Sequence, residues 1–389
     1  MRFLSYVLRN ARRSPVRTFL TIGSTSMCLF LMMMLLSFIA TFESVGSSLR
    51  EYNRLVVMSS QGFSQPVPAA RVAEIRAMDG VAAVTPFSWF GGKYNNEVMP
   101  FAQFGVDPNT MFTIYDEYAV QPDQLKAFQA ERTACVIGRK LAEERKIKLG
   151  DVLPLKGDIY PVDLNLVVRG FYDTAEKRNP RMCLFHWDYL NEEFKKVSPG
   201  SKMIENAGIV SMRCKSADVM PALAKRIDAS YLNSDTPTRT QSEEAFNQMF
   251  LGMFGDLRAL ISNIGLAVVF SLIFVAGNAM AMALRERTTE VAVLRAIGFG
   301  RGLVINLVLA ESILVTMIGG VIGTLGAKAL FDAVDISRYT AGFLPFFFVP
   351  WRTALLGLGA ALVIGFLSGI LPALGAARLS VVNGLRKVV

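Results

Sequence analysis

The sequence has few of the side chains that carry out enzymatic chemistry. It contains one histidine, His186, and four cysteines among 389 residues. No two cysteines have the C-x-x-C spacing typical of metal and redox sites, and a lone histidine beside Trp187 is expected to be a structural or surface residue. Three cysteines lie outside the first apolar run and allow at most one internal disulfide plus an odd thiol: Cys135, Cys183 and Cys214.

Motifs for nucleotide binding and hydrolysis are also absent. There is no G-x-x-x-x-G-K-[ST] phosphate loop, no H-E-x-x-H and no G-x-S-x-G, so we expect no enzyme activity and no cofactor bound by this chain. The nearest serine pattern, Gly365 to Gly369, has the wrong spacing for a nucleophile. The glycines from Gly298 to Gly302 follow no predicted strand, so we interpret them as a turn at the end of a helix.

The net charge of +9 is not gathered on an accessible domain. Between residues 43 and 256, 25 Lys and Arg stand against 27 Asp and Glu, a net charge of −2, which leaves +11 for the rest of the chain. Nucleic-acid binding needs a basic accessible face. We therefore do not expect it, and we attribute the basic excess to segments that flank membrane spans.

Two strongly apolar regions lie at opposite ends of the chain. A membrane-spanning helix needs about 20 mostly apolar residues. The first region provides such a run without one charge, and its length and the lack of a small-residue cleavage site favour a retained helix over a signal peptide. Charges divide the second region into three runs, which gives four predicted spans in total: 18–42, 260–284, 303–329 and 353–373.

Basic residues predict which side of the membrane each segment faces, because Lys and Arg of short flanking segments stay on the cytoplasmic side. Five arginines precede the first span, four lie between the second and third, and three Lys or Arg follow the fourth. We therefore expect the amphipathic N-terminal segment 1–17, the segment 285–302 and the tail 374–389 in the cytoplasm. The large insert and the short loop 330–352 would face the opposite side.

The insert, residues 43–240, has an ordinary globular composition and suits one domain or two small lobes. Its periodicities predict a mixed α+β domain, with strands and helices at these positions: Arg54–Ser59, Val81–Pro86, Leu164–Phe171 and Gly208–Arg213 for strands, and Ala69–Met78, Gly138–Lys146 and Ala217–Leu232 for helices. Residues 241–259 carry aromatic and Met side chains on one face. This favours a stalk helix that extends the second span, with ordinary amphipathic packing as the alternative.

Small residues recur at helical intervals inside the last two spans. Helices in lipid associate where small residues let their backbones approach. We expect such packing faces at Gly319, Gly323 and Gly326 in the third span and at Gly357, Ala361, Gly365, Gly369 and Ala373 in the fourth. Glu311 lies inside the third span, where an ionisable group is costly. We expect a structural or coupling role for it instead of a proton relay, since no second acid accompanies it.

The segment between the second and third spans alternates charged and apolar residues. Val291, Leu294 and Ile297 share one helical face between charged flanks. Such a helix lies along the membrane surface or docks into a partner.

These patterns together resemble the FtsX-like, or MacB-type, permease family of ABC transporters, and the resemblance covers the whole chain. The family's cytoplasmic stretch is matched from Arg287 to Gly298, and its later glutamate and glycine pair by Glu311 and Gly319-Gly320. The closing pattern is matched by Pro372, Ala373, Ala376, Ala377, Arg378, Leu379, Val382, Leu385 and Arg386. Segments such as Gly105-Val106-Asp107-Pro108 resemble its periplasmic core domain.

The resemblance implies a transmembrane subunit of a type VII, or mechanotransmission, ABC transporter in the bacterial inner membrane. It implies an ABC ATPase partner that holds ATP and Mg²⁺, and a second permease copy, either identical or related. The ATPase would dock on a coupling helix through Glu286, Glu290, Val291, Leu294, Arg295, Ile297 and Gly298. MacB itself carries a fused ATPase domain, so this sequence is expected to be closer in layout to the separate permeases of lipoprotein-extraction and exporter systems.

The sequence does not identify the molecule on which such a transporter would act, its client. Candidates are a lipoprotein or lipid extracted from the membrane, a drug or peptide expelled through a periplasmic adaptor and outer-membrane channel, and a cell-wall hydrolase that is switched on. An ATP-independent receptor or scaffold is the contrasting class, and it would need no ATPase partner.

Overall fold

The computed structural model describes residues 15–49, 52–97, 100–174, 181–201, 203–252, 257–334, 336 and 347–378, and the chain divides into two compact units. We call them the helical unit, which contains the apolar helices, and the insert domain, which lies between the first and second of these helices in sequence. Most of the predicted segment 1–17, much of the loop 330–352 and most of the tail 374–389 lie outside the described residues.

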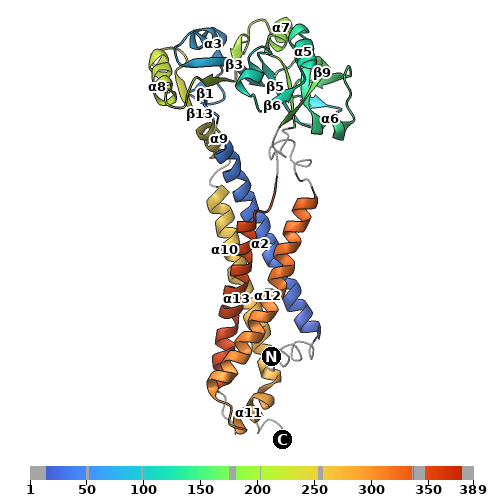
Figure 1. Cartoon of the computed structure of the whole chain (residues 1–389), viewed down its shortest axis with the longest axis vertical. Helices are drawn as coiled ribbons and strands as arrows, with labels where there is room; N and C mark the ends of the chain where they lie inside the picture. The colour runs from blue at the N-terminus through green and yellow to red at the C-terminus, as the bar shows by residue number, and fades with distance from the viewer. Residues whose placement is uncertain are drawn as a thin grey trace. The chain divides into compact units, whose positions relative to one another are not determined.

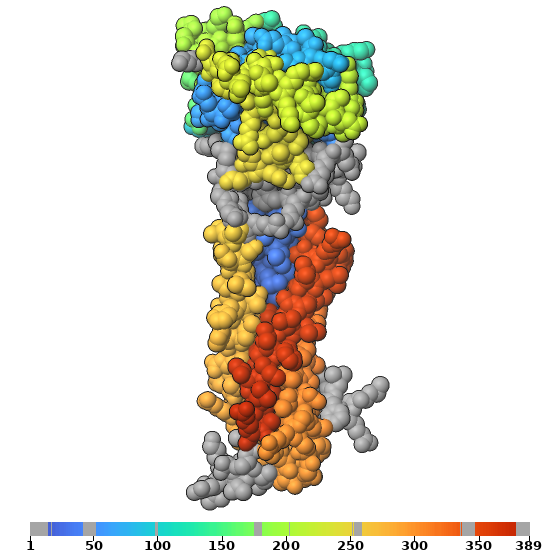
Figure 2. Space-filling view, turned by 90° about the vertical axis from the view of Figure 1, so that its left-hand side faces the viewer, coloured from blue at the N-terminus to red at the C-terminus, as the bar shows by residue number. Residues whose placement is uncertain are grey.

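Among the described residues, four helices are long and apolar enough to cross a membrane: α2 (Pro15–Leu49), α10 (Leu257–Glu286), α12 (Arg301–Ala333) and α13 (Trp351–Arg378). The short helix α11 (Thr288–Ala296) joins α10 to α12 in sequence. Figure 2 shows α13 between α10 and α12, and α13 makes most of its contacts with these two helices. Each helix extends beyond its predicted apolar run, because polar residues at its ends continue the backbone hydrogen bonding.

The small residues of the last two spans lie where helices approach closely. A Cβ added to Gly365 would lie 2.9 Å from the Cα of Ile313, and one on Gly369 would lie 2.7 Å from the Cβ of Ser312. A Cβ added to four other glycines would also lie within 3 Å of a neighbouring residue: Thr25 for Gly319, Ser26 for Gly323, Ala361 for Gly320 and Met33 for Gly357. Gly326 differs from the prediction, since no atom lies within 4 Å of its added Cβ.

The insert domain is built on one mixed sheet, visible in Figure 1. Its strands follow the order β13-β1-β12-β3-β5-β10-β7-β9-β8-β4, and β6 pairs with β9. The pairs β5/β10 and β7/β9 are parallel and the other pairs in this sheet are antiparallel. The bounds are β1 (Arg54–Ser59), β3 (Val81–Trp89), β4 (Lys93–Tyr94), β5 (Ala102–Val106), β6 (Tyr118–Val120), β7 (Ala134–Gly138), β8 (Val152–Lys156), β9 (Leu164–Thr174), β10 (Met182–His186), β12 (Ile209–Cys214) and β13 (Thr238–Ser242). The short strands β2 (Val67–Pro68) and β11 (Asn206–Ala207) form a separate pair.

Seven helices of the described insert domain pack around these strands: α3 (Ala69–Arg76), α4 (Met111–Ile114), α5 (Pro122–Ala130), α6 (Arg139–Arg145), α7 (Trp187–Val197), α8 (Met220–Tyr231) and α9 (Glu243–Gly252). One apolar core joins β1, β3 and β12 to α3 and α8. Two others lie beneath α4 and α5 and beneath α6 and α7. The predicted α+β class is confirmed.

The predicted stalk 241–259 begins later than expected. Gln241 and Ser242 complete β13, where they pair with Val56 and Leu55 of β1. The helix α9 therefore starts at Glu243, and residues 253–256 lie outside the described part of the chain. From Thr238 to Gln241, residues buried in the sheet alternate with more exposed ones, so the strand continues up to Ser242. The helical periodicity from residue 241 onward did not predict this strand.

The single histidine and the three cysteines of the insert domain lie in its interior. His186 is buried, its Nε2 lies 2.6 Å from the Phe128 carbonyl oxygen, and burial lowers the pKa of its imidazole. The structure therefore places His186 as a structural residue. Cys135, Cys183 and Cys214 are buried free thiols, and burial raises the pKa of Cys135 and Cys214.

Candidate functional site

The turn between α11 and α12 closes on a glycine that has to adopt a left-handed backbone. Gly298 has φ +103°, a conformation that costs glycine least. The Phe299 N–H donates to the Leu294 carbonyl oxygen at 3.1 Å, and the Gly298 N–H donates to that of Arg295 at 3.1 Å. This pair of bonds is a Schellman cap, which ends α11 sharply and lets α12 begin at Arg301.

Glu311 is paired with an arginine at the start of α11. Nη1 of Arg287, the N-cap residue of α11, lies 2.9 and 3.0 Å from the two carboxylate oxygens of Glu311. The two side chains are 13% and 14% exposed, so the pair lies largely out of contact with solvent. Because each charge would be costly to bury alone, the pair ties the N-cap residue of the short helix to α12.

A cavity of about 20 Å³ adjoins this ion pair, large enough for about one water molecule. Besides Arg287 and Glu311, three helices contribute to its lining. The lining residues from these helices are Thr18 and Thr21 of α2, Ala279, Met280 and Ala283 of α10, and Val315 of α12. The ion pair therefore marks the place where α2, α10 and α12 meet the start of α11.

One face of α11 is covered by its own chain. Val291 and Ala292 are buried, and Val291 packs against Val304 of α12 and Ala376 of α13. Nη1 of Arg295 donates to the Ala377 carbonyl oxygen at 3.3 Å. Val291 was expected on the docking surface, but here its side chain is buried and attaches α11 to α12 and α13.

The opposite face of α11 and its closing turn expose apolar side chains. Ile297 is 72% exposed, Val293 42% and Phe299 40%, while Leu294 is half-buried and Gly298 exposed. Glu290 and Arg295 are half-buried on the same short helix. Glu286, expected on the coupling helix, is instead the last residue of α10. We define the exposed apolar surface of α11 as Val293, Ile297 and Phe299.

The sequence reasoning missed the partner of Glu311. Arg287 carried two signals, its place in the basic segment and its match to the family pattern, but neither one links it to a residue 24 positions later. The expected structural or coupling role of Glu311 was therefore stated without a partner for its charge. A carboxylate buried in a span calls for a cation nearby, and the flanking arginines were the available candidates.

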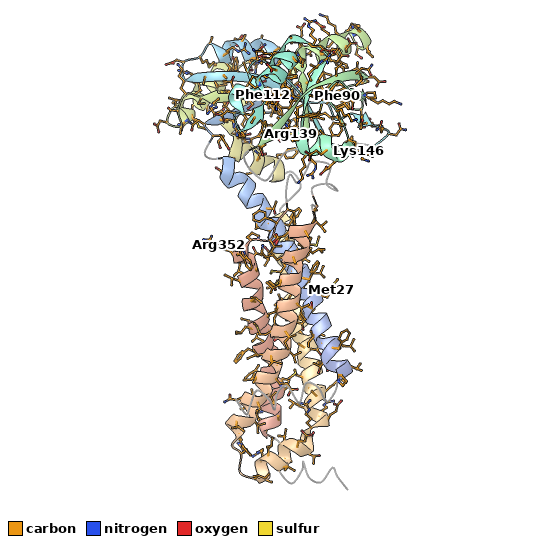
Figure 3. All side chains as sticks on the ribbon, turned by 45° about the vertical axis from the view of Figure 1, so that its right-hand side comes forward. Met27, Phe90, Phe112, Arg139, Lys146 and Arg352 are labelled. Carbon is orange, nitrogen blue, oxygen red and sulfur yellow. The ribbon has the colours of Figure 1, made fainter. Side chains whose placement is uncertain are left out.

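The insert domain has a shallow surface hollow of about 340 Å³. Arg139 and Lys146, labelled in Figure 3, line it, and Phe171 and Ile147 contribute apolar surface. Arg139 is already engaged, because its Nε lies 2.7 Å from an Asp173 carboxylate oxygen and its guanidinium lies over the Phe171 ring. We assign no role to this hollow.

Two family models match the chain. The MacB-like periplasmic core domain matches residues 18–230, and the FtsX-like permease C-terminal region matches residues 262–381. Similar proteins include the uncharacterized ABC transporter permease MJ1507 of Methanocaldococcus jannaschii, 22% identical over 86% of this chain and 84% of that protein. The uncharacterized ABC transporter permease YknZ of Bacillus subtilis is 26% identical over 67% of this chain and 63% of its own length.

Two solved structures are also similar in part. The extracellular domain of the YknZ transporter aligns with 49% of this chain and 100% of its own at 15% identity and a TM-score of 0.35. The periplasmic region of MacB from Actinobacillus actinomycetemcomitans aligns with 51% of this chain and 92% of its own at 12% identity and a TM-score of 0.37.

The MacB-like model alone spans more than half of the chain, and the FtsX-like model covers α10 to α13. The protein therefore belongs to the FtsX-like permease family with a MacB-like periplasmic core domain, and it is a permease subunit of an ABC transporter of this type.

Proposed function

We propose that this chain is the membrane subunit of a type VII ABC transporter and works as a mechanical transmitter. A separate ABC ATPase binds ATP and Mg²⁺, and its ATP-driven movement passes through α11 and the spans to the insert domain. The insert domain then drives export or extraction of a client: a lipoprotein, lipid, drug or peptide. The chain itself binds no nucleotide and has no catalytic residue.

The observation that carries this proposal is the attachment of α11 to the spans. Arg287 ties its first turn to Glu311 of α12, Val291 packs on α12 and α13, and Arg295 reaches the end of α13. A helix held in this way cannot be displaced without moving the spans around it. Its exposed apolar surface remains available to a partner.

The proposed orientation places α11 in the cytoplasm, the insert domain outside it, and both chain ends inside. The arginines around α11 support this orientation. Two permeases, identical or related, would pair and bind one ATPase subunit each. A periplasmic adaptor, an outer-membrane channel or a lipoprotein client are further proposed partners, together with the surrounding membrane lipid.

Substitution of Ile297 by Asp tests the docking surface. The chain is purified in detergent from its host, recovered partners are identified by mass spectrometry, and ATP hydrolysis of the complex is measured. We expect Ile297→Asp to lower ATPase recovery at least tenfold, since burying a carboxylate without a partner is costly. Val152→Asp, an exposed apolar residue of β8, is the matched control and should change nothing.

The opposite results are equally informative. Undiminished ATPase recovery with Ile297→Asp would place docking elsewhere. Absence of any ABC ATPase from the wild-type complex would favour an ATP-independent receptor or scaffold. Recovery of a cell-wall hydrolase in place of a transport client would favour an FtsX-like regulator.

A further inference from the structure

An arginine is buried at the start of the first strand of the insert domain. Arg54 begins β1, five residues after Leu49, the last residue of α2, and it is 1% exposed. All six residues of β1 are buried, and the other five carry no charge. An apolar side chain would satisfy this position for packing alone, so the presence of a guanidinium requires a specific reason.

Two carboxylates from distant parts of the chain converge on Arg54. Its Nε donates to Oε2 of Glu243 at 2.6 Å, and its Nη1 donates to the two oxygens of Glu117 at 2.8 and 2.9 Å. Nη1 also lies 3.3 Å from the Ile114 carbonyl oxygen. A planar guanidinium fixes the direction of each partner as well as its distance.

Two aromatic rings enclose the same guanidinium. Its Cζ lies 4.2 Å from the ring centre of Tyr52 and 4.3 Å from that of Tyr115. The Tyr115 hydroxyl is 2.9 Å from Oγ of Ser211 in β12, and its ring stacks on Tyr118. The rings exclude solvent from the ion pairs and connect them to the adjoining core.

Arg54, Glu117 and Glu243 come from three segments that lie far apart in the sequence. Arg54 begins the strand that follows α2, and Glu243 is the first residue of α9, which precedes α10 in sequence. Glu117 lies between α4 and β6, on a segment that packs into a different core. Figure 1 shows β1, β13 and α9 next to one another in the insert domain. One side chain thus joins the entry and exit segments of the domain.

We propose that Arg54 is a positioning residue for transmission: acting through Glu243, it fixes the direction of α9 on β1, so that displacement of either adjoining span reaches the sheet as a single rigid movement. The proposal rests on the proposed transmitter function. Glu117 extends the same link to the α4 segment, so that both halves of the sheet follow the movement together.

The test is hydrogen exchange on the full permease–ATPase complex in lipid nanodiscs, at rest and with ATP plus vanadate. The variant Arg54→Met keeps the length of the side chain and removes the charge. Glu243→Gln is the milder second variant, which remains informative if Arg54→Met does not fold. Arg71→Met is the matched control, because Arg71 is also buried and packs over an aromatic ring, that of Tyr231 in α8, but is not bonded to a residue of α9 in any interaction described for it.

At rest we expect the α9 amides of both test variants to exchange about tenfold faster than in the wild type, while β12 and α8 keep their protection. With ATP and vanadate, the wild-type insert domain should change its exchange pattern. In the variants this response should disappear while ATP hydrolysis persists. Arg71→Met should lower the melting temperature yet leave the α9 exchange and the ATP response intact.

Wild-type exchange of α9 together with a wild-type ATP response in Glu243→Gln and Arg54→Met would overturn the positioning role. An equal loss of protection in α9, β12 and α8 would also overturn it, since that pattern means general destabilisation. If the wild-type complex itself gives no ATP response, the transmitter function fails, and the resting exchange of α9 still decides whether Arg54 fixes this helix.

Discussion

At the scale of single residues, the helical unit contains the largely buried ion pair between Arg287 and Glu311. Removing the carboxylate with Glu311→Ala leaves the Arg287 charge in a largely buried setting. We expect a loss of about 3 kcal/mol in stability, as when one partner of a buried pair is truncated. Thermal unfolding of the purified complex measures it.

The double variant Arg287→Met with Glu311→Leu separates packing from coupling. Replacing both charges by apolar groups should restore most of the melting temperature, because no buried charge remains. ATP-driven change in the insert domain should stay reduced, since α11 has lost its directional link to α12. A double variant as unstable as Glu311→Ala would show that the charges are not the source of the effect.

The buried His186 predicts a pH dependence at the same scale. Burial holds the pKa of its imidazole below the usual value of 6.5, so the unfolded chain binds more protons than the folded domain below that pH. Stability is therefore complete above pH 6.5 and falls as the pH drops from there toward the lowered folded pKa. The emission of the adjacent Trp187 follows the unfolding, and His186→Gln should remove the slope in this range.

At the scale of elements, α12 and α13 are held at close range by glycines. A methyl group at Gly365 would lie 2.9 Å from a backbone atom of Ile313, so Gly365→Ala should destabilise the pair of helices by about 1–3 kcal/mol. Gly359 lies in the same helix with no atom within 4 Å of an added Cβ. Gly359→Ala should be neutral or stabilising by up to about 1 kcal/mol, since alanine favours helix. Thermal unfolding compares them, and equal effects would contradict the packing argument.

At the scale of the whole molecule, the proposed topology places two exposed residues on opposite sides of the membrane. Val152 is 56% exposed in the insert domain and Ile297 is 72% exposed beside α11. A maleimide that cannot cross the inner membrane, applied to cells in which only the outer envelope layer has been permeabilised, should label Val152→Cys. It should label Ile297→Cys only after the inner membrane is opened. The native thiols of the insert domain are buried and contribute little background. Reversed labelling would invert the topology.

Local patterns were sufficient for much of this architecture. The apolar runs predicted the spans, and the strand-like run from Arg54 to Ser59 predicted β1 with its observed bounds. The pairings of Arg287 with Glu311 and of Arg54 with Glu117 and Glu243 were not predictable, because they join residues far apart in sequence. The burial of Val291 was not predictable for another reason: an apolar stripe on a helix packs on the chain's own helices as well as on a partner.

The register of β1 also determines when the insert domain can complete its folding. Leu55 pairs with Met212 of β12 and with Ser242 of β13, so the earliest strand to be synthesised waits for the latest ones. Until residue 214 has emerged both edges of this fully buried strand stay open, and the edge that pairs with β13 stays open until residue 242; such edges are sites of aggregation. Folding of this permease therefore has a vulnerable interval spanning nearly the whole synthesis of the insert domain, during which a holding chaperone would have its target at β1.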